Sequence, residues 1–195
     1  MNLMQRFALL AGACLLTTGA LAQAITVADV KYPETLKMAD ASLQLNGAGV
    51  RYKAIFKVYA AGLYLEKRAA TPPEVMALKG PKRISITMLR EIDSAEMGKL
   101  FSRGMEDNTD RATFSRLTPS VQRMGQLFSD LKKLAEGDQI VIDWLPGTGT
   151  LVTVKGKPQG EPFTEPEFFN ALLGIWLGQA PVDSKLKDAL LGKPT

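Results

Sequence analysis

The residue types available for chemistry in this chain are limited, because its 195 residues include no histidine and a single cysteine, Cys14. Serine or cysteine nucleophiles that depend on a histidine base are excluded, and so are metal sites built from histidines. A lone cysteine can form neither an intrachain disulfide nor a thiolate cluster. Any reaction or ligand contact must therefore use carboxylates, lysine, arginine, tyrosine or hydroxyl groups.

Arg51 is the most informative charged residue. It lies at the start of the apolar segment 50–65, where a free guanidinium is costly. It should therefore pair with a carboxylate in a surface salt bridge or with the anionic group of a ligand. Tyr59 follows on the same face and is either an ordinary core tyrosine or a hydroxyl donor to a ligand. On one unbroken strand the two side chains would be about 26 Å apart, so they share a ligand only if a bulge or turn intervenes.

Two other groups have simpler interpretations. Gly47-Ala48-Gly49 begins like a dinucleotide fingerprint, but a strand follows where the phosphate site needs a helix, so we predict no cofactor. We interpret these glycines as a hairpin or bulge that requires positive φ. The methionines beyond residue 24 are core residues or the adaptable wall of an apolar pocket.

The bulk composition is that of a folded domain without a nucleic-acid partner. Hydrophobic residues make up 46% and charged residues 23% of the chain, which is close to the globular average. The net charge of +4 is small, and the densest basic cluster is Lys79, Lys82 and Arg83. Such a cluster is more typical of a solvated turn than of a nucleic-acid footprint.

The N-terminus is typical of a secretory signal peptide. Arg6 precedes an uncharged apolar run over 7–21, and the A-x-A motif that ends at Ala24 fits cleavage after that residue. The run is shorter than the roughly 20 residues that a membrane span needs. We therefore predict a signal peptide at 1–24 and a single domain at 25–195, periplasmic or secreted and without stable membrane insertion.

Strand and helix patterns are mixed along the remaining chain. Strands are expected over 25–30, 43–46, 50–65, 83–89, 139–145 and 150–154, with a hairpin at Asn46-Gly47. Helices are expected from Thr71 to Gly80, from Asp93 through Met105, from near Thr118 to Gly137, over 168–177 after a capping box at Thr164 and Glu167, and over 183–191. A sheet built from early and late strands, with helices inserted between them, makes the fold class α+β.

The segment 45–66, LNGAGVRYKAIFKVYAAGLYLE, resembles the signature strand of the chalcone isomerase family, in which G-x-G-x-R precedes K-[FV]-[TY]-A-x-G-[VL]-Y-L-E. Weaker similarity covers nearly the whole mature chain, including ADVKYPETL, SITMLREI and LLGIWLGQAPVDSKLKDALLG. The resemblance implies an open-faced β-sandwich, in which a layer of helices covers a large antiparallel sheet and a ligand cleft lies between the layers.

The same resemblance implies residue roles. Arg51 matches the family's catalytic arginine, and Tyr59 replaces a threonine, as it does in the non-catalytic fatty-acid-binding branch. The family's catalytic tyrosine is replaced by Phe114, an asparagine by Val121 and a late hydroxyl residue by Ile175. Without these polar groups, the wall cannot stabilise the oxyanion that develops during chalcone ring closure.

We therefore predict a periplasmic, non-catalytic chalcone isomerase-like protein that binds a small apolar ligand, with a fatty acid as one candidate and with no catalytic residue, cofactor or metal. Arg51 and Tyr59 would bind the carboxylate. The tail would be lined by Phe101, Phe114, Val121 and Ile175. Two alternatives remain open: an isomerase or lyase of unknown substrate, and a cell-envelope interaction protein without a small ligand.

Overall fold

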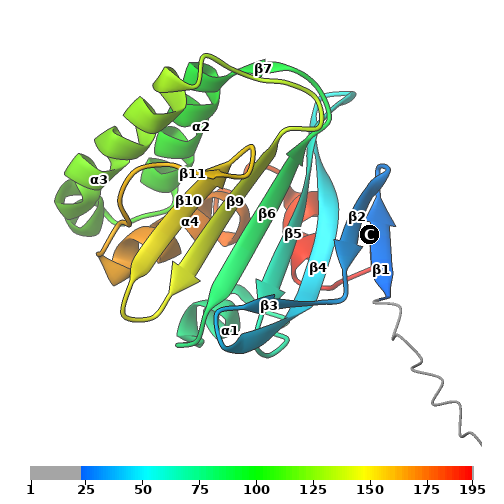
Figure 1. Ribbon diagram of the computed structural model, residues 1–195. Helices are drawn as coiled ribbons and strands as arrows, with labels where there is room; N and C mark the ends of the chain where they lie inside the picture. Colours follow the sequence, from blue (N-terminus) through cyan, green and yellow to red (C-terminus); the bar gives the residue numbers. More distant parts are fainter. Residues whose placement is uncertain (1–22, 195) are drawn as a thin grey trace, which may run out of the picture.

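A seven-stranded antiparallel sheet forms the centre of the protein (Figure 1). The computed structural model describes residues 23–194; residues 1–22, which contain most of the predicted signal peptide, lie outside that part, so the signal peptide stays a prediction. Across the sheet the strands follow the order β11-β10-β9-β6-β5-β4-β3. Their bounds are β3 Thr35–Met38, β4 Ala41–Lys53, β5 Phe56–Leu65, β6 Lys82–Met88, β9 Gln139–Leu145, β10 Gly149–Val154 and β11 Lys157–Pro158.

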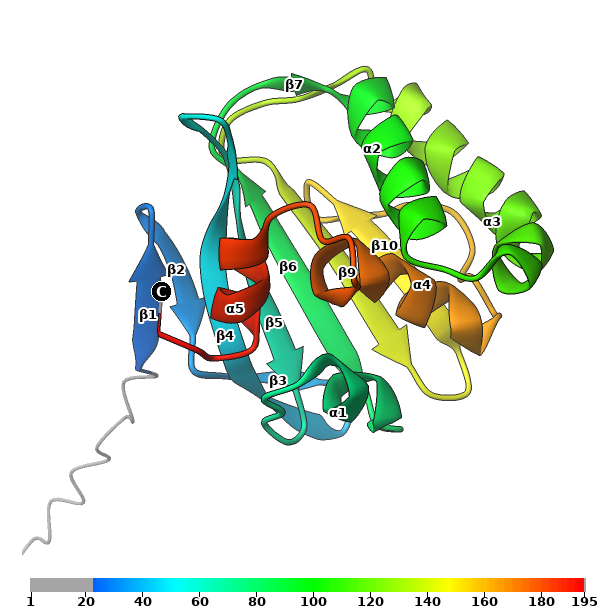
Figure 2. The ribbon, with the colours of Figure 1, turned by 180° about the vertical axis from the view of Figure 1, so that it is seen from behind.

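Helices cover one face of this sheet, as Figure 2 shows for α2, α3, α4 and α5. The helices are α1 Pro72–Ala77, α2 Ser94–Asp107, α3 Arg111–Asp130, α4 Pro166–Leu177 and α5 Ser184–Leu190. Two small sheets complete the fold, made of β1 Ala24–Val27 with β2 Val30–Pro33 and of β7 Ile92–Asp93 with β8 Lys133–Leu134. This arrangement confirms the predicted α+β class and the helix-covered antiparallel sheet.

The main core fills the space between the sheet and the helices. Ile84 and Ile86 of β6 and Ile140 and Ile142 of β9 are fully buried there, because alternate residues of a strand share one face. Helix α4 is apolar on nearly all sides, since α2, α3, α5 and β10 all contact it. The sequence pattern predicts both features.

The opposite face of the sheet is covered only in part. A second cluster packs Tyr32 of β2 against Leu43, Leu45 and Tyr64 of the sheet. Farther along this face, Arg83 of β6 donates two hydrogen bonds to Asp143 of β9, at 2.6 and 2.7 Å. This bidentate pair holds the pKa of Arg83 above its ordinary value, and it accounts for the acidic residue in an otherwise apolar strand.

Two segments that the sequence predicts as single strands are hairpins. Segment 50–65 turns at Ala54, whose φ is +54°, and returns as β5. Segment 25–30 turns at Ala28 and Asp29, which also have positive φ. Neither turn contains the glycine or Asn-Gly pair that normally marks a two-residue hairpin, so the pattern gives no signal for it. The hairpin predicted at Asn46-Gly47 is wrong, because these residues lie inside β4.

Asn46 instead joins three parts of the fold through its buried amide. Its Nδ2 donates to the carbonyls of Ala69 and Leu190, at 3.0 and 2.7 Å, and its Oδ1 accepts from the N–H of Ala69 at 2.8 Å. Strand β4 is thereby tied to the segment after β5 and to the end of α5. A buried amide persists because its hydrogen bonds are satisfied.

Gly47 and Gly49 are required by a close approach of α5 rather than by positive φ. A Cβ on Gly47 would collide with the carbonyl oxygen of Ala189, and one on Gly49 would meet the Ala189 side chain at 2.6 Å. The predicted bulge is present, since the β4–β5 register shifts between Leu45 and Gly47.

Replacing Gly47 by alanine should lower the free energy of unfolding by roughly 1–3 kcal/mol or more, because backbone atoms of α5 must move. Gly125→Ala is the matched control: its Cβ would find only Ser102 Oγ at 3.9 Å, inside α3. The control should be neutral or stabilising by up to about 1 kcal/mol, because alanine favours helix. Urea unfolding measures both, and equal stability of the two variants would contradict the close-approach explanation.

The helix ends differ from the predicted ones at α3 and α4, and α1 ends at Ala77 instead of the predicted Gly80. Helix α3 begins at Arg111 rather than near Thr118, because Asp110 caps it by accepting from the N–H of Thr113 at 3.0 Å. It ends at Asp130, before the predicted Gly137. The predicted capping box before α4 is wrong: Glu165 occupies the N-cap position, and its carboxylate accepts a hydrogen bond from Ser120 of α3 at 2.7 Å.

Within residues 23–194, Lys82 is the only charged residue that is almost completely buried, with 3% of its surface exposed. Its Nζ donates to the carbonyl of Leu78 at 2.6 Å. Burial, assisted by the charge of Lys79, lowers the pKa of Lys82 from 10.5 to about 8. Between these values the unfolded chain binds a proton that the folded chain does not, so stability should rise with pH.

Lys82→Met should abolish this rise in the free energy of unfolding. We expect wild type to gain stability relative to this variant as the pH increases above about 8. Lys99→Met, at an exposed position of α2 and not among the charges that shift the pKa of Lys82, should keep the wild-type slope. Urea unfolding at several pH values up to about 9 checks this, where tyrosines of the unfolded chain, with an ordinary pKa near 10, are still mostly protonated. Parallel curves for wild type and Lys82→Met would contradict it.

Candidate ligand-binding cleft

The β4–β5 hairpin brings Arg51 and Tyr59 directly opposite each other. The two residues are Cα partners in the antiparallel ladder, and the Arg51 guanidinium carbon lies 5.7 Å from the centroid of the Tyr59 ring. The separation expected for one unbroken strand therefore does not apply. The turn at Ala54 is what assembles this pair.

The Arg51 guanidinium is half-buried and has no carboxylate partner. Across the described range 23–194, it forms no ion pair within 4 Å and donates no side-chain hydrogen bond. The carboxylate of Asp183 is already used: it accepts from the backbone N–H of Tyr52 at 2.9 Å and caps α5. The predicted surface salt bridge is therefore not seen, and the guanidinium can receive an outside anion.

Tyr59 is buried beneath Arg51 and contacts α4. Its hydroxyl oxygen accepts a hydrogen bond from Trp176 Nε1 at 2.8 Å, and the position is almost completely shielded from solvent. Burial raises the pKa of Tyr59 to about 12, although the Arg51 charge opposes the rise. The phenol is thus neutral at physiological pH, and its proton can be donated to a ligand oxygen.

A narrow apolar cavity lies next to these two residues, between the sheet and the helices. Its volume is about 10 Å³, which is room for a single water molecule. It is lined by Arg51, Val58, Tyr59, Ile92, Met97, Leu100, Phe101, Ile175 and Val182. Apart from the guanidinium and the phenol, every lining side chain is apolar.

A wider outer cleft of about 240 Å³ adjoins this inner cavity and shares Arg51, Val58, Ile92 and Leu100 with it. Its other lining residues are charged: Lys53, Arg90, Glu91 and Glu96. The Glu91 carboxylate is paired with Lys133 at 3.0 Å. Arg51 therefore stands where a polar, solvent-facing mouth meets an apolar interior.

Four of the six residues predicted to bind the ligand line this inner cavity together: Arg51, Tyr59, Phe101 and Ile175. The other two do not line it. Both belong to α3, where Phe114 is half-buried at the edge of the main core and Val121 is buried within it. Whether any of the six contacts a ligand stays a prediction.

The sequence does not identify several of the residues that line the inner cavity. Met97 and Leu100 belong to the same apolar stripe of α2 as Phe101, so that stripe is a usable signal. Val182 lies in the α4–α5 connection, and Val58 is placed by the unpredicted hairpin. No sequence pattern marks either of them.

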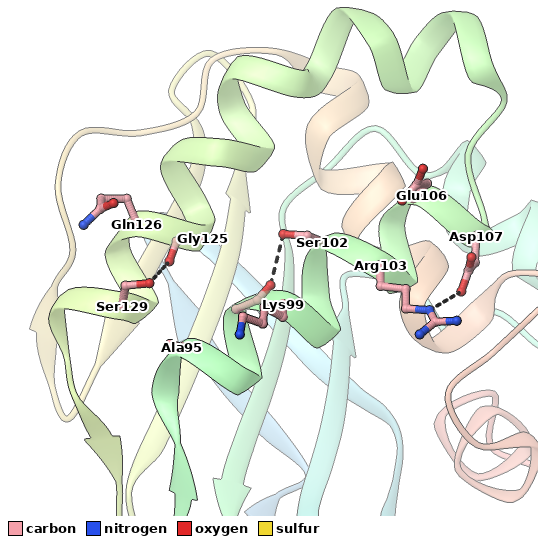
Figure 3. A pocket seen from close by; sticks show the side chains of 10 residues that line it. Ala95, Lys99, Ser102, Arg103, Glu106, Asp107, Gly125, Gln126 and Ser129 are labelled. Atoms are coloured by element: carbon pink, nitrogen blue, oxygen red, sulfur yellow. Dashed lines mark hydrogen bonds and ion pairs between the residues drawn. The ribbon is translucent and has the colours of Figure 1, made fainter.

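A larger hollow of about 680 Å³ lies between α2 and α3 (Figure 3). Its two serine hydroxyls are bonded within their own helices: Ser102 donates to the Gly98 carbonyl at 3.0 Å and Ser129 to the Gly125 carbonyl at 3.1 Å. The hollow is open to solvent, and none of the buried side-chain N or O atoms that lack a partner within 23–194 belongs to its lining residues. It offers a ligand no anchor comparable to Arg51.

No three histidine, cysteine, aspartate or glutamate side chains within 23–194 are grouped so that they could hold a metal ion. Among the helices of that range, none is both long enough and apolar enough to cross a membrane.

The fold and the cleft together define a class: an antiparallel sheet with helices on one face and an arginine at the mouth of an apolar cavity between the layers. The sequence profile of the chalcone isomerase-like family matches residues 24–192, and the chain belongs to that family. No curated protein matches the chain.

Solved structures add a likeness in fold. The chain is similar to the crystal structure of an Arabidopsis thaliana fatty-acid binding protein, with a TM-score of 0.67 and 17% sequence identity. The match covers 87% of this chain and 96% of that one. The predicted family and fold are therefore confirmed.

Proposed function

We propose that this protein binds a long-chain fatty acid in the cleft between the β4–β5 hairpin and α2, without catalysing a reaction on it. The observation that carries the proposal is Arg51, whose half-buried guanidinium has no carboxylate partner within 23–194 and adjoins an apolar cavity. A ligand with one anionic end and one apolar end satisfies both features. The fatty-acid-binding relative in fold supports the same choice.

In this proposal, the carboxylate is held by two groups. The guanidinium of Arg51 presents N–H donors in a fork that suits a bidentate carboxylate. The phenol of Tyr59 adds a neutral donor, oriented by the hydrogen bond from Trp176. The apolar tail then extends past Leu100 and Phe101.

The inner cavity must widen to accept an alkyl chain, because 10 Å³ does not hold one. The side chains that would move are those of α2, where Met97 and Leu100 line the cavity and Met105 lies one turn beyond Phe101. Methionine has three rotatable bonds and repacks at low cost. The buried methionines would thus form the adaptable wall of an apolar pocket, which is one of the two roles that the sequence allows for them; the other is simple core packing.

Two further parts of the proposal rest on the sequence. At the positions where the resemblance to the family implies polar catalytic groups, this chain has the apolar residues Phe114, Val121 and Ile175. This replacement supports ligand binding without a catalysed reaction. The order of residues in 1–24 supports export, so we place the protein in the periplasm or outside the cell.

Competition between palmitate and hexadecanol tests the proposal, because the two share a chain and differ in the head group. We expect palmitate to displace a fluorescent fatty acid from one saturable site and to bind roughly 10-fold or more tightly than the alcohol, as a charge-assisted hydrogen bond requires. Native mass spectrometry of the complex should show one bound palmitate. Equal displacement by the alcohol, or no saturable binding, would refute the proposal.

A further inference from the structure

The tip of the β4–β5 hairpin carries most of the exposed large apolar surface of the described chain. Three of the four exposed large hydrophobic residues within 23–194 are here: Tyr52, Ile55 and Phe56, which are 42%, 84% and 55% exposed. The fourth is Ile25 on β1. Figure 2 shows the cyan hairpin projecting beyond the edge of the sheet. We call residues 52–57 the hairpin tip.

None of these three side chains belongs to a hydrophobic core cluster of residues 23–194. Ile55 follows the turn residue Ala54 and belongs to neither core cluster, and a polar residue would serve a solvent-exposed turn better. Isolated exposed hydrophobics are ordinary, but three of them within five residues at the end of a projecting hairpin mark an interaction surface.

The charges around the tip are basic. Lys53 and Lys57 flank its apolar residues, no acidic residue occurs in 52–57, and the Arg90 guanidinium carbon lies 5.1 Å from the centroid of the Phe56 ring. Acidic residues beside the tip are bonded elsewhere or face the cleft: Asp183 accepts from the backbone N–H of Tyr52 at 2.9 Å and caps α5, Glu91 is paired with Lys133, and Glu96 lies in the outer cleft. The tip thus combines an apolar wedge with cations that remain unneutralised.

We propose that the hairpin tip docks on an anionic lipid bilayer. Aromatic and aliphatic side chains at a narrow apex insert at head-group depth, and flanking lysines and arginines pair with lipid phosphates. A folded protein partner fits less well, because a stable protein interface needs about 800 Å² from each side, and this apex is one two-stranded turn.

Docking in this orientation has a consequence that rests on the proposed function. Lys53 and Arg90 line the outer cleft, so the mouth of the cleft faces the head-group layer when the tip is inserted. A fatty acid can then pass from the bilayer to Arg51 without crossing bulk water. The docking surface itself does not depend on that ligand.

Vesicle flotation tests the docking. Wild type should float with vesicles of phosphatidylcholine and phosphatidylglycerol in equal molar amounts, and only weakly with phosphatidylcholine alone. Ile55→Ser with Phe56→Ser should weaken binding roughly 10-fold or more, and Ile25→Ser, at an apolar residue of β1 that is 45% exposed, should leave it within about 2-fold.

A charge pair of variants tests the electrostatic part. Lys53→Glu with Lys57→Glu should weaken binding at least roughly 30-fold, since each lost cation contributes about 5-fold and the two new carboxylates are repelled by the anionic surface. Lys31→Glu with Lys37→Glu makes the same change in net charge at exposed positions of β2 and β3 and should have little effect. The proposal would be overturned if both tip variants floated with the vesicles as well as wild type does. It would also be overturned if the control variants lost as much vesicle binding as the tip variants.

A dye attached at one position distinguishes membrane docking through the hairpin tip from membrane binding through the apolar run at 7–21, which every variant retains. In a Cys14→Ser background, an environment-sensitive dye on Ile55→Cys should shift to the blue on anionic vesicles, while the same dye on Ile25→Cys should not. A shift at neither site would overturn docking through the tip. Failure of docking and failure of fatty-acid binding are distinguishable, because Arg51→Gln should still float and Ile55→Ser with Phe56→Ser should still bind palmitate.

Discussion

Replacing Arg51 by glutamine is expected to weaken palmitate binding roughly 30-fold or more, because truncating one partner of a desolvated ion pair costs about 2–5 kcal/mol. The substitution leaves the carboxylate in an apolar setting with only the Tyr59 hydroxyl to bind it. Displacement of a fluorescent fatty acid measures the change. The melting temperature should move little, since Arg51 has no ion pair or side-chain hydrogen bond within 23–194 and loses only its contact with the Tyr59 ring.

Arg90→Gln is the matched control for this variant. Arg90 lines the same outer cleft and carries the same charge, but it is exposed and its guanidinium lies over the Phe56 ring instead of at the inner cavity. Its loss should change palmitate affinity by less than about 3-fold, as for a screened surface charge. Equal effects of the two substitutions would show general electrostatic attraction rather than a specific contact.

Phe101→Ala should produce the largest loss of stability, about 3–5 kcal/mol in the free energy of unfolding. Phe101 is buried and packs edge-on against Phe128 and Trp176, with ring centroids 5.3 and 5.6 Å away. It also lines the inner cavity, so its removal enlarges the space that the ligand tail must enter. Palmitate should therefore raise the melting temperature of this variant more than that of wild type.

Phe128→Ala separates the cavity from general core damage. Phe128 is equally buried and belongs to the same aromatic cluster, but it does not line the cavity. It should lose similar stability without any additional stabilisation by palmitate. If palmitate stabilises both variants to the same extent, the tail does not lie beside Phe101.

The sequence predicts the fold where the periodic pattern and the packing agree. The buried alternation of Ile84 and Ile86 and the apolar α4 follow directly from their spacing. The pattern fails where a feature depends on a distant segment or on backbone conformation alone. Ala54 adopts positive φ without a turn signature, and Asn46 and Gly47 are explained by contacts with α5, more than 140 residues later.

The candidate site likewise has residues that the sequence identifies and an arrangement that the sequence could not predict. The sequence identifies Arg51 because a charged side chain at the start of an apolar segment is costly unless it has a partner. It identifies Tyr59 because this residue lies on the same face of that segment. Their proximity could not be predicted, since it depends on the unsignalled turn. Phe114 and Val121 illustrate the converse: a motif match places them at functional positions, but α3 carries them outside the lining of this cavity.

The most direct test of the central claim follows the carboxyl carbon of ¹³C-labelled palmitate by NMR as the pH is varied in the bound state. If Arg51 pairs with the carboxylate, the pKa of the bound ligand should be lower in wild type than in Arg51→Gln by at least about one unit, because a nearby opposite charge favours the ionised form and burial without it favours the neutral form. Identical titration curves in the two proteins would show that Arg51 does not bind the fatty-acid head group.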